Sequence, residues 1–307
     1  MLEVRPIIWK ILLKYAPLHK DIKDSTLNRK REDYKRFVNL YYVDAKENGF
    51  SENEQKIMKI IINDVFRTQP TYRLFHHKKI QEMMIRILWV WQVRHPATSY
   101  VQGMNDLITP FLTVFISEHI CNVDVDALEV PSGFEENLTE EIQDKIEADT
   151  FWSLSKILDG ILDNFTFKTG TEKAMNKIKD IIKKIDLELY KHLENVDPSQ
   201  YIFKVFSLRW LFSLLIREFS LKVAVRLFDT YISDDQGFSV LHLYVCASIL
   251  LKWSIKLKKM NLDNIMLFLQ DLPTKQWSEQ DLDVIIAEAY VFKSLYEEST
   301  GHLAVSI

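Results

Sequence analysis

The sequence predicts an all-α fold, and two observations support that prediction. Glycine and proline, the residues that punctuate turn-rich β architectures, number only 7 and 8 among 307 residues. Leu, Ile, Lys and Glu recur with helical spacing almost throughout the chain. No segment repeats with a fixed period, which argues against a regular solenoid. We therefore expect a helical globular fold without a significant β-sheet.

The chain begins with an apolar stripe at the spacing of one helical face, formed by Ile7, Ile8, Ile11, Leu12 and Tyr15. A second helix is expected from Ser25 towards Lys46, closed by Gly49, because glycine readily adopts the left-handed conformation that ends helices. Ser51 and Glu54 have the spacing of a capping box, which predicts a third helix that ends near Asp64.

Two further helices should follow in this half of the chain. The first runs from about His76 to Arg94 and stops at His95, because a residue before proline resists the α conformation. The second should start near Tyr100 and bend at Pro110, whose ring disturbs the preceding turn.

An acidic segment then separates this half from a second one. Between Asn122 and Asp149, ten Asp or Glu residues stand against one Lys. We expect an exposed acidic connection over about 122–140, which merges into a helix from about Thr139. Beyond it, one Lys-rich amphipathic helix and two much more apolar stretches predict the core of a second helical half, at Ala174–Leu193, 201–232 and 239–257.

Composition excludes several classes of function. Apolar residues make up 47% and charged residues 27%, which is typical of a globular chain. The net charge is −4, whereas proteins that bind nucleic acid are typically basic, so the charge does not indicate nucleic-acid binding. No apolar run approaches the roughly 18 residues that cross a bilayer. Cys121 and Cys246 lie far apart in apolar surroundings, which suits reduced thiols, so we expect a cytoplasmic protein.

Two short patterns are the most informative for function: Ile61-x-x-Asp64-x-x-Arg67 and Tyr100-x-Gln102-Gly103-Met104. Arg67 follows a predicted helix end, where a loop can lift its guanidinium away from the surface. That planar fork can bridge phosphate oxygens as they gain charge during phosphoryl transfer. Taken alone, Arg67 is better interpreted as an ordinary solvated loop arginine.

Gln102 carries one acceptor and two donors on its amide. It can therefore accept from a water while donating to phosphoryl oxygens, which aligns that water for attack. Gly103 beside it allows another backbone to approach closely. The alternative is a glutamine bonded to local backbone at a helix start.

Together, Arg67 and Gln102 match the needs of a slow GTPase. Such an enzyme lacks both an oriented water and a cation over the transition-state charge, and a partner protein can supply both.

Other residues near these patterns fit supporting roles. Asp64 can position Arg67 or another arginine such as Arg209, and the alternative is that it caps a helix end. Tyr100 and Asn105 are expected to support the loop of Gln102.

Arg209 lies inside an apolar helix, where an arginine needs a partner to be tolerated. Asp64 and Glu218 are the candidate partners, and a structural ion pair is the preferred interpretation. Arg226 and Asp229 fit the same kind of structural role.

Both patterns resemble the signature motifs of the TBC domain, a family of GTPase-activating proteins that act on Rab GTPases. The resemblance covers about residues 5–260 and is strongest in the branch that includes the yeast Golgi-associated activator. Further strings resemble the family in the expected order: Thr26–Tyr34, Arg94–Asp106, Glu147–Leu154, Leu208–Glu218 and Arg226–Tyr231. Two positions depart from it, since Phe66 replaces a proline and Phe228 a tryptophan.

The resemblance implies a single domain over 1–307 with two helical lobes, about 1–170 with the catalytic motifs and 171–307. It implies a GTP-loaded Rab GTPase as partner, with Arg67 and Gln102 acting in trans and Gln102 standing in for the GTPase's own glutamine. The chain has no G-x-x-x-x-G-K loop and no metal-ligand spacing of histidines, so GTP and magnesium should come with the GTPase.

The resemblance also suggests a Golgi or other endomembrane location, with peripheral recruitment through the partner or through flanking segments. Two alternatives remain: a catalytically silent TBC-fold module that binds a GTPase or scaffold, and a purely structural helical adaptor. Because neither Arg67 nor Gln102 is lost, the sequence favours the activator. We expect both side chains to reach one shared groove.

Overall fold

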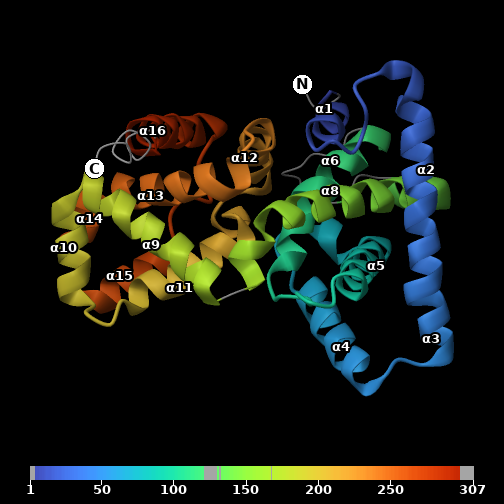
Figure 1. Cartoon of the computed structure of the whole chain (residues 1–307), viewed down its shortest axis with the longest axis horizontal. Coiled ribbons are helices and arrows are strands. Elements are labelled where there is room, and N and C mark those ends of the chain that lie inside the picture. Colours follow the sequence, from blue (N-terminus) through green and yellow to red (C-terminus); the bar gives the residue numbers. More distant parts are fainter. Residues whose placement is uncertain (1–3, 121–129, 131–132, 167, 298–307) are drawn as a thin grey trace, which may run out of the picture. The chain divides into compact units, whose positions relative to one another are not determined.

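A computed structural model describes residues 4–120, 130, 133–166 and 168–297 (Figure 1). Within these residues every regular element is a helix, which confirms the all-α prediction. The chain divides into two compact units, Met1–Gly160 and Ile161–Ile307. The expected acidic connection lies for its greater part outside the described residues.

The first unit is built from the helices that carry both functional patterns. They are α1 (Arg5–Leu12), α2 (Lys20–Val38), α3 (Asp44–Asn48), α4 (Glu52–Phe66), α5 (Lys78–Arg94), α6 (Met104–His119), α7 (Phe134–Asn137) and α8 (Glu140–Thr166), with a π-helical turn at Asn39–Val43 and a 3-10 turn at Arg73–His76. Helices α4, α5 and α6 contact one another, and α1 contacts α6. The buried faces of α5 and α6 supply much of this unit's apolar core.

Several helix ends follow the local chemistry of the sequence. The Ser51 hydroxyl accepts from the Glu54 amide and the Glu54 carboxylate accepts from the Ser51 amide, so the predicted capping box starts α4. Helix α5 ends at Arg94, before His95, as expected. Helix α6 begins at Met104 rather than near Tyr100, because Gly103 before it has a φ of 107° and leaves the helical region.

The stripe predicted for the first helix faces the core only at its end, where Tyr15 is buried and Ile11 packs against its cluster. Ile7, Ile8 and Leu12 are 39%, 46% and 43% exposed, whereas Trp9 and Lys10 are buried. The Trp9 ring packs edge-on against Phe111 of α6, with ring centroids 5.5 Å apart. Ion pairs hold Lys10 inside the unit, and they fix the rotation of α1 about its axis.

Two carboxylates of α8 hold the surrounding helices through charged hydrogen bonds. Asp149 accepts from the Arg31 guanidinium at 2.7 and 2.8 Å and lies 2.6 Å from the Lys10 ammonium. Glu147 accepts from Arg86 of α5 at 2.7 Å and from the Tyr34 hydroxyl at 2.7 Å. Buried charges are tolerated only when paired in this way.

These two carboxyl groups respond differently to their surroundings. Burial works against ionisation of Asp149, but the Arg31 hydrogen bonds and the Lys10 charge hold its pKa below the ordinary value. For Glu147, burial outweighs the attraction of Arg86 and raises the pKa. The string Glu147–Leu154 therefore has a structural role, because it ties α1, α2 and α5 to α8.

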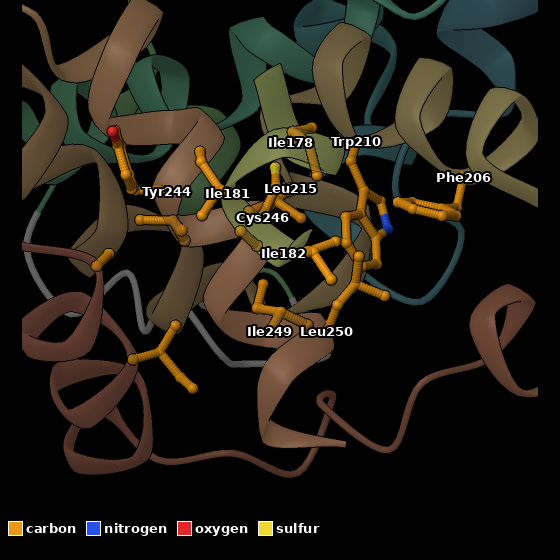
Figure 2. Close-up of a cluster of buried hydrophobic side chains, with 14 of the residues drawn as sticks. Ile178, Ile181, Ile182, Phe206, Trp210, Leu215, Tyr244, Cys246, Ile249 and Leu250 are labelled. Carbon is orange, nitrogen blue, oxygen red and sulfur yellow. The ribbon is translucent and has the colours of Figure 1, made fainter. Parts of the chain in front are cut away.

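The second unit has its own apolar core, part of which Figure 2 shows. Its helices after α8 are α9 (Lys168–Ile185), α10 (Leu187–Val196), α11 (Tyr201–Ser213), α12 (Leu221–Ser233), α13 (His242–Lys252), α14 (Ser254–Leu257), α15 (Leu262–Gln270) and α16 (Glu279–Glu297), with a 3-10 turn at Ile216–Glu218 and a π-helical turn at Gly237–Leu241. Isoleucines of α9 pack with Trp210 of α11 and with α13. Cys246 is a buried free thiol in this core, and Cys121 lies outside the described residues.

No helix in the described part of the chain is both long enough and apolar enough to span a membrane.

Candidate functional site

Arg67 lies directly after the last residue of α4. Its Nε donates to the Asn63 carbonyl at 3.0 Å, and one terminal nitrogen donates to Oδ1 of Asp64 at 3.0 Å. The Arg67 side chain is 68% exposed, whereas that of Asp64 is 5% exposed. The guanidinium is therefore accessible to another molecule while a buried carboxylate anchors it from below.

Gln102 lies in the loop between α5 and α6. Two residues of this loop have a positive φ, Ser99 at 57° and Gly103 at 107°. A side chain at Gly103 would be strained in this conformation, which explains why glycine stands there. Gln102 is exposed, and its side chain makes no hydrogen bond within the described part of the chain.

A hydrogen-bond network joins the two patterns. The Asp64 carboxylate accepts from Arg67 on Oδ1 and from the Tyr100 hydroxyl on Oδ2, the latter at 2.9 Å. The Asn105 amide donates to Oγ1 of Thr68 at 2.9 Å, and that hydroxyl donates to the Asp64 carbonyl at 2.9 Å. Asp64 thus connects the arginine at the end of α4 with the loop that carries the glutamine.

Burial makes this network rigid. Asp64, Thr68 and Asn105 are 4%, 1% and 2% exposed, so an unmade hydrogen bond there would be costly. Burial, followed by the negative charge of Asp64, raises the pKa of Tyr100 well above its ordinary value. Tyr100 therefore keeps its proton and acts as a donor to Asp64.

Sequence reasoning placed Asp64, Tyr100 and Asn105 in supporting positions, and the structure brings them together. It missed Thr68. The available signal was a small hydroxyl residue directly after the arginine, four residues beyond Asp64, where a threonine can bond to the carbonyl of the preceding turn.

Arg209 is held within the second unit. Its Nε lies 2.9 Å from Oε1 of Glu218, and a terminal nitrogen donates to the Leu269 carbonyl at 2.6 Å. Of the two partners considered, Glu218 is thus the one observed. Burial raises the pKa of Glu218 although Arg209 opposes the shift. Arg226 likewise pairs with Asp283, at 2.7 Å. These contacts are structural.

The first unit also contains a cavity of about 470 Å³, whose lining differs from that of the Arg67 and Gln102 site. Its charged lining includes Arg86 paired with Glu147, Lys35 with Asp144 and Lys145 with Glu141. Its positive groups are therefore already neutralised, and neither Arg67 nor Gln102 lines it. Among the described residues no group of three or more His, Cys, Asp or Glu is placed to hold a metal ion.

The fold and this geometry define a class of protein: an all-helical domain that presents an arginine and a glutamine from two loops held by one carboxylate. Comparison with known proteins identifies the family. The profile of the Rab-GTPase-TBC domain matches residues 2–258, and the chain belongs to that family.

Full-length relatives carry matching names. The chain is 42% identical over 311 residues to "GTPase-activating protein gyp1" of Schizosaccharomyces pombe, covering 98% of this chain and 57% of that protein. It is 39% identical over 302 residues to human "TBC1 domain family member 22B", with the same coverage. Against "GTPase-activating protein GYP1" of Saccharomyces cerevisiae it is 30% identical, covering 97% of this chain and 55% of that protein. The chain therefore spans little more than half the length of these relatives.

Solved structures support the fold. The crystal structure of the Ypt/Rab-GAP domain of Gyp1p superposes with a TM-score of 0.88 at 34% identity, covering 96% of this chain and 89% of that one. A Chlamydomonas flagellar RabGAP TBC domain superposes with a TM-score of 0.61 at 13% identity, over 94% of this chain and 80% of that one, which shows a shared fold.

Proposed function

We propose that this chain is a GTPase-activating domain that accelerates GTP hydrolysis by a partner Rab GTPase. The observation that carries the proposal is the Asp64 carboxylate, which holds Arg67 with one oxygen and the Gln102 loop, through Tyr100, with the other. This network links the two segments that carry Arg67 and Gln102, the groups suited to phosphoryl transfer. The names of two relatives, both called GTPase-activating proteins, point the same way.

Arg67 has the charge and the freedom that the reaction needs. Its guanidinium would neutralise charge on the β- and γ-phosphate oxygens in the transition state, where such a finger is typically worth about 10³ to 10⁵ in rate. To reach a nucleotide, the terminal nitrogen would exchange the Asp64 carboxylate for phosphate. The Asp64 pair therefore serves to hold the side chain in a restricted set of positions before the GTPase binds.

Gln102 would orient the attacking water, since its amide can accept from the water and donate to a phosphoryl oxygen at once. No side chain here has to remove a proton, because this reaction depends on positioning and on electrostatic stabilisation. GTP and magnesium would come with the GTPase. We expect Arg67 and Gln102 to enter one groove around the nucleotide.

A catalytically silent module that only binds a GTPase or scaffold is the second candidate. Such a module has no need for an exposed arginine and an exposed glutamine linked through one buried carboxylate, and this arrangement favours the activator.

We place the activity on the cytoplasmic face of the Golgi or another endomembrane, because the string Arg94–Asp106 resembles the branch of the family that includes the yeast Golgi-associated activator.

The test is single-turnover GTP hydrolysis by a panel of Rab proteins with the native chain and with Arg67→Ala and Gln102→Ala. We expect stimulation of at least one Rab, reduced by about 10³ or more in Arg67→Ala and by about 10² to 10³ in Gln102→Ala. Arg29→Ala and Gln276→Ala are matched controls, because both residues are exposed and outside the network. Binding of GTP-loaded Rab without any stimulation would instead support the silent module.

A further inference from the structure

Helix α1 and the chain that follows it expose an unusual set of large aliphatic side chains. We call them the N-terminal apolar face: Val4, Ile7, Ile8, Leu12, Leu18 and Ile22, which are 53%, 39%, 46%, 43%, 82% and 50% exposed. They lie on neighbouring elements, because Ile11 of α1 packs against a small cluster that contains Leu27 of α2. Large exposed apolar side chains gathered on neighbouring elements commonly mark an interaction site.

The rotation of α1 that exposes this face is fixed by the opposite side of the helix. Lys10 is 2% exposed, and its ammonium lies 2.6 Å from both Glu118 and Asp149. Trp9 is buried at the same level of the helix. Turning α1 to bury its isoleucines would expose Trp9 and leave Asp149 short of a charge partner. The apolar face is therefore a stable feature of the fold.

The surroundings of the face are basic. Apart from the buried and paired Lys10, the chain has four Lys or Arg residues and two acidic ones between Val4 and Asp24, whereas the whole chain has a net charge of −4. Lys14 and Lys20 are exposed, and no carboxylate of the described residues pairs with either. Their ammonium groups are available to an anionic partner.

We propose that the N-terminal apolar face docks on a lipid bilayer with anionic headgroups. Aliphatic side chains would enter the boundary of the acyl chains, and the lysines would extend to the headgroups above them. Each lysine near such a surface contributes about 1 kcal/mol, or about fivefold in affinity. The acidic remainder of the chain would be repelled, which orients this face towards the membrane.

The charge pattern argues against a second copy of this chain as the occupant, since two such faces would bring Lys14 and Lys20 of both copies together. Shape argues against a folded protein surface. Leu18 projects with 82% of its area exposed, and a rigid partner would need a matching hollow, whereas a bilayer adapts to protruding side chains.

Vesicle co-sedimentation of the native chain tests the proposal, with vesicles of phosphatidylcholine alone and of phosphatidylcholine mixed with phosphatidylserine. We expect binding to the mixed vesicles, weakened by salt. Lys14→Glu/Lys20→Glu should weaken it at least about fivefold for each lysine, and Ile7→Ser/Ile8→Ser should weaken it about tenfold or more. Ile255→Ser and Lys191→Glu/Lys204→Glu are matched controls at exposed positions of the second unit.

Thermal unfolding confirms that each variant is folded, so a loss of binding can be assigned to the face. Absence of binding, equal binding to both kinds of vesicle, or equal loss in the control variants would overturn the proposal. So would a dimer in solution that Ile7→Ser/Ile8→Ser dissociates, because the occupant would then be a second copy. No GTPase is present in this experiment, and its outcome is independent of the proposed catalytic function.

Discussion

At the scale of single residues, the hydroxyl of Thr68 illustrates how the site is made stiff. It accepts from the buried amide of Asn105 and donates to the carbonyl of Asp64, so it joins the start of α6 to the end of α4. Asp64 in turn holds Arg67. The position of the arginine thus depends on a hydroxyl that is hydrogen-bonded to Asp64 and Asn105 rather than to Arg67 or Gln102.

Thr68→Val tests that dependence, because valine keeps the volume and removes the hydroxyl. The buried Asn105 amide would lose its 2.9 Å acceptor and keep only the Asp64 carbonyl at 3.4 Å, so we expect the free energy of unfolding to fall by about 1–3 kcal/mol. Stimulated hydrolysis should fall less than in Arg67→Ala, and Thr68→Ser should restore both properties. Denaturant unfolding and single-turnover kinetics measure the two effects. If Thr68→Val retained full stability and rate, the hydroxyl would have no positioning role.

The site was predictable from the sequence only in part. The patterns around Arg67 and Gln102 name the residue types that phosphoryl transfer needs, and local spacing suggested that Asp64 holds Arg67. The bond from Tyr100 to Asp64 joins residues 36 apart in the chain. That contact depends on how α4 and α6 pack, and no local pattern encodes it.

At the scale of elements, α1 shows the limit of periodicity. Ile7 and Ile8 have the spacing of a buried stripe, yet they are exposed and the helix buries Trp9 and Lys10. A stripe pattern counts apolar residues and ignores ion pairs, and here the carboxylates of Asp149 and Glu118 decide the outcome. The capping box of α4 and the end of α5 before His95 were predictable, because each depends on contacts within a few residues.

The rotation of α1 about its axis, which buries Lys10 and exposes Ile7, leads to a prediction about stability. Lys10→Ala removes one of the cations that neutralise the buried Asp149, so we expect a loss of about 3 kcal/mol in the free energy of unfolding. Ile7→Ala, on the same helix, removes a partly exposed side chain and should cost less than about 1 kcal/mol. Urea unfolding of both variants gives the comparison. A larger cost for Ile7→Ala than for Lys10→Ala would show that α1 buries its isoleucines.

At the scale of the whole molecule, the proposed function divides the chemistry between two proteins. This chain would supply a cation and an amide, whereas the nucleotide, the metal ion and the water-filled site would belong to the GTPase. The chain would therefore bind the GTPase most tightly when the phosphoryl group carries its transition-state charge. It would bind more weakly before and after the reaction.

That division predicts the response to a transition-state analogue. A Rab that the chain stimulates, loaded with GDP and aluminium fluoride, should bind the chain at least about 100-fold more tightly than the same Rab with GDP alone. Arg67→Ala should remove most of this gain, because in the proposed mechanism its guanidinium would face the added charge, while Arg29→Ala should keep it. Calorimetric titration of the three proteins measures the effect. An equal gain for native chain and Arg67→Ala would mean that the arginine does not contact the transferring phosphoryl group, and the finger mechanism would be wrong.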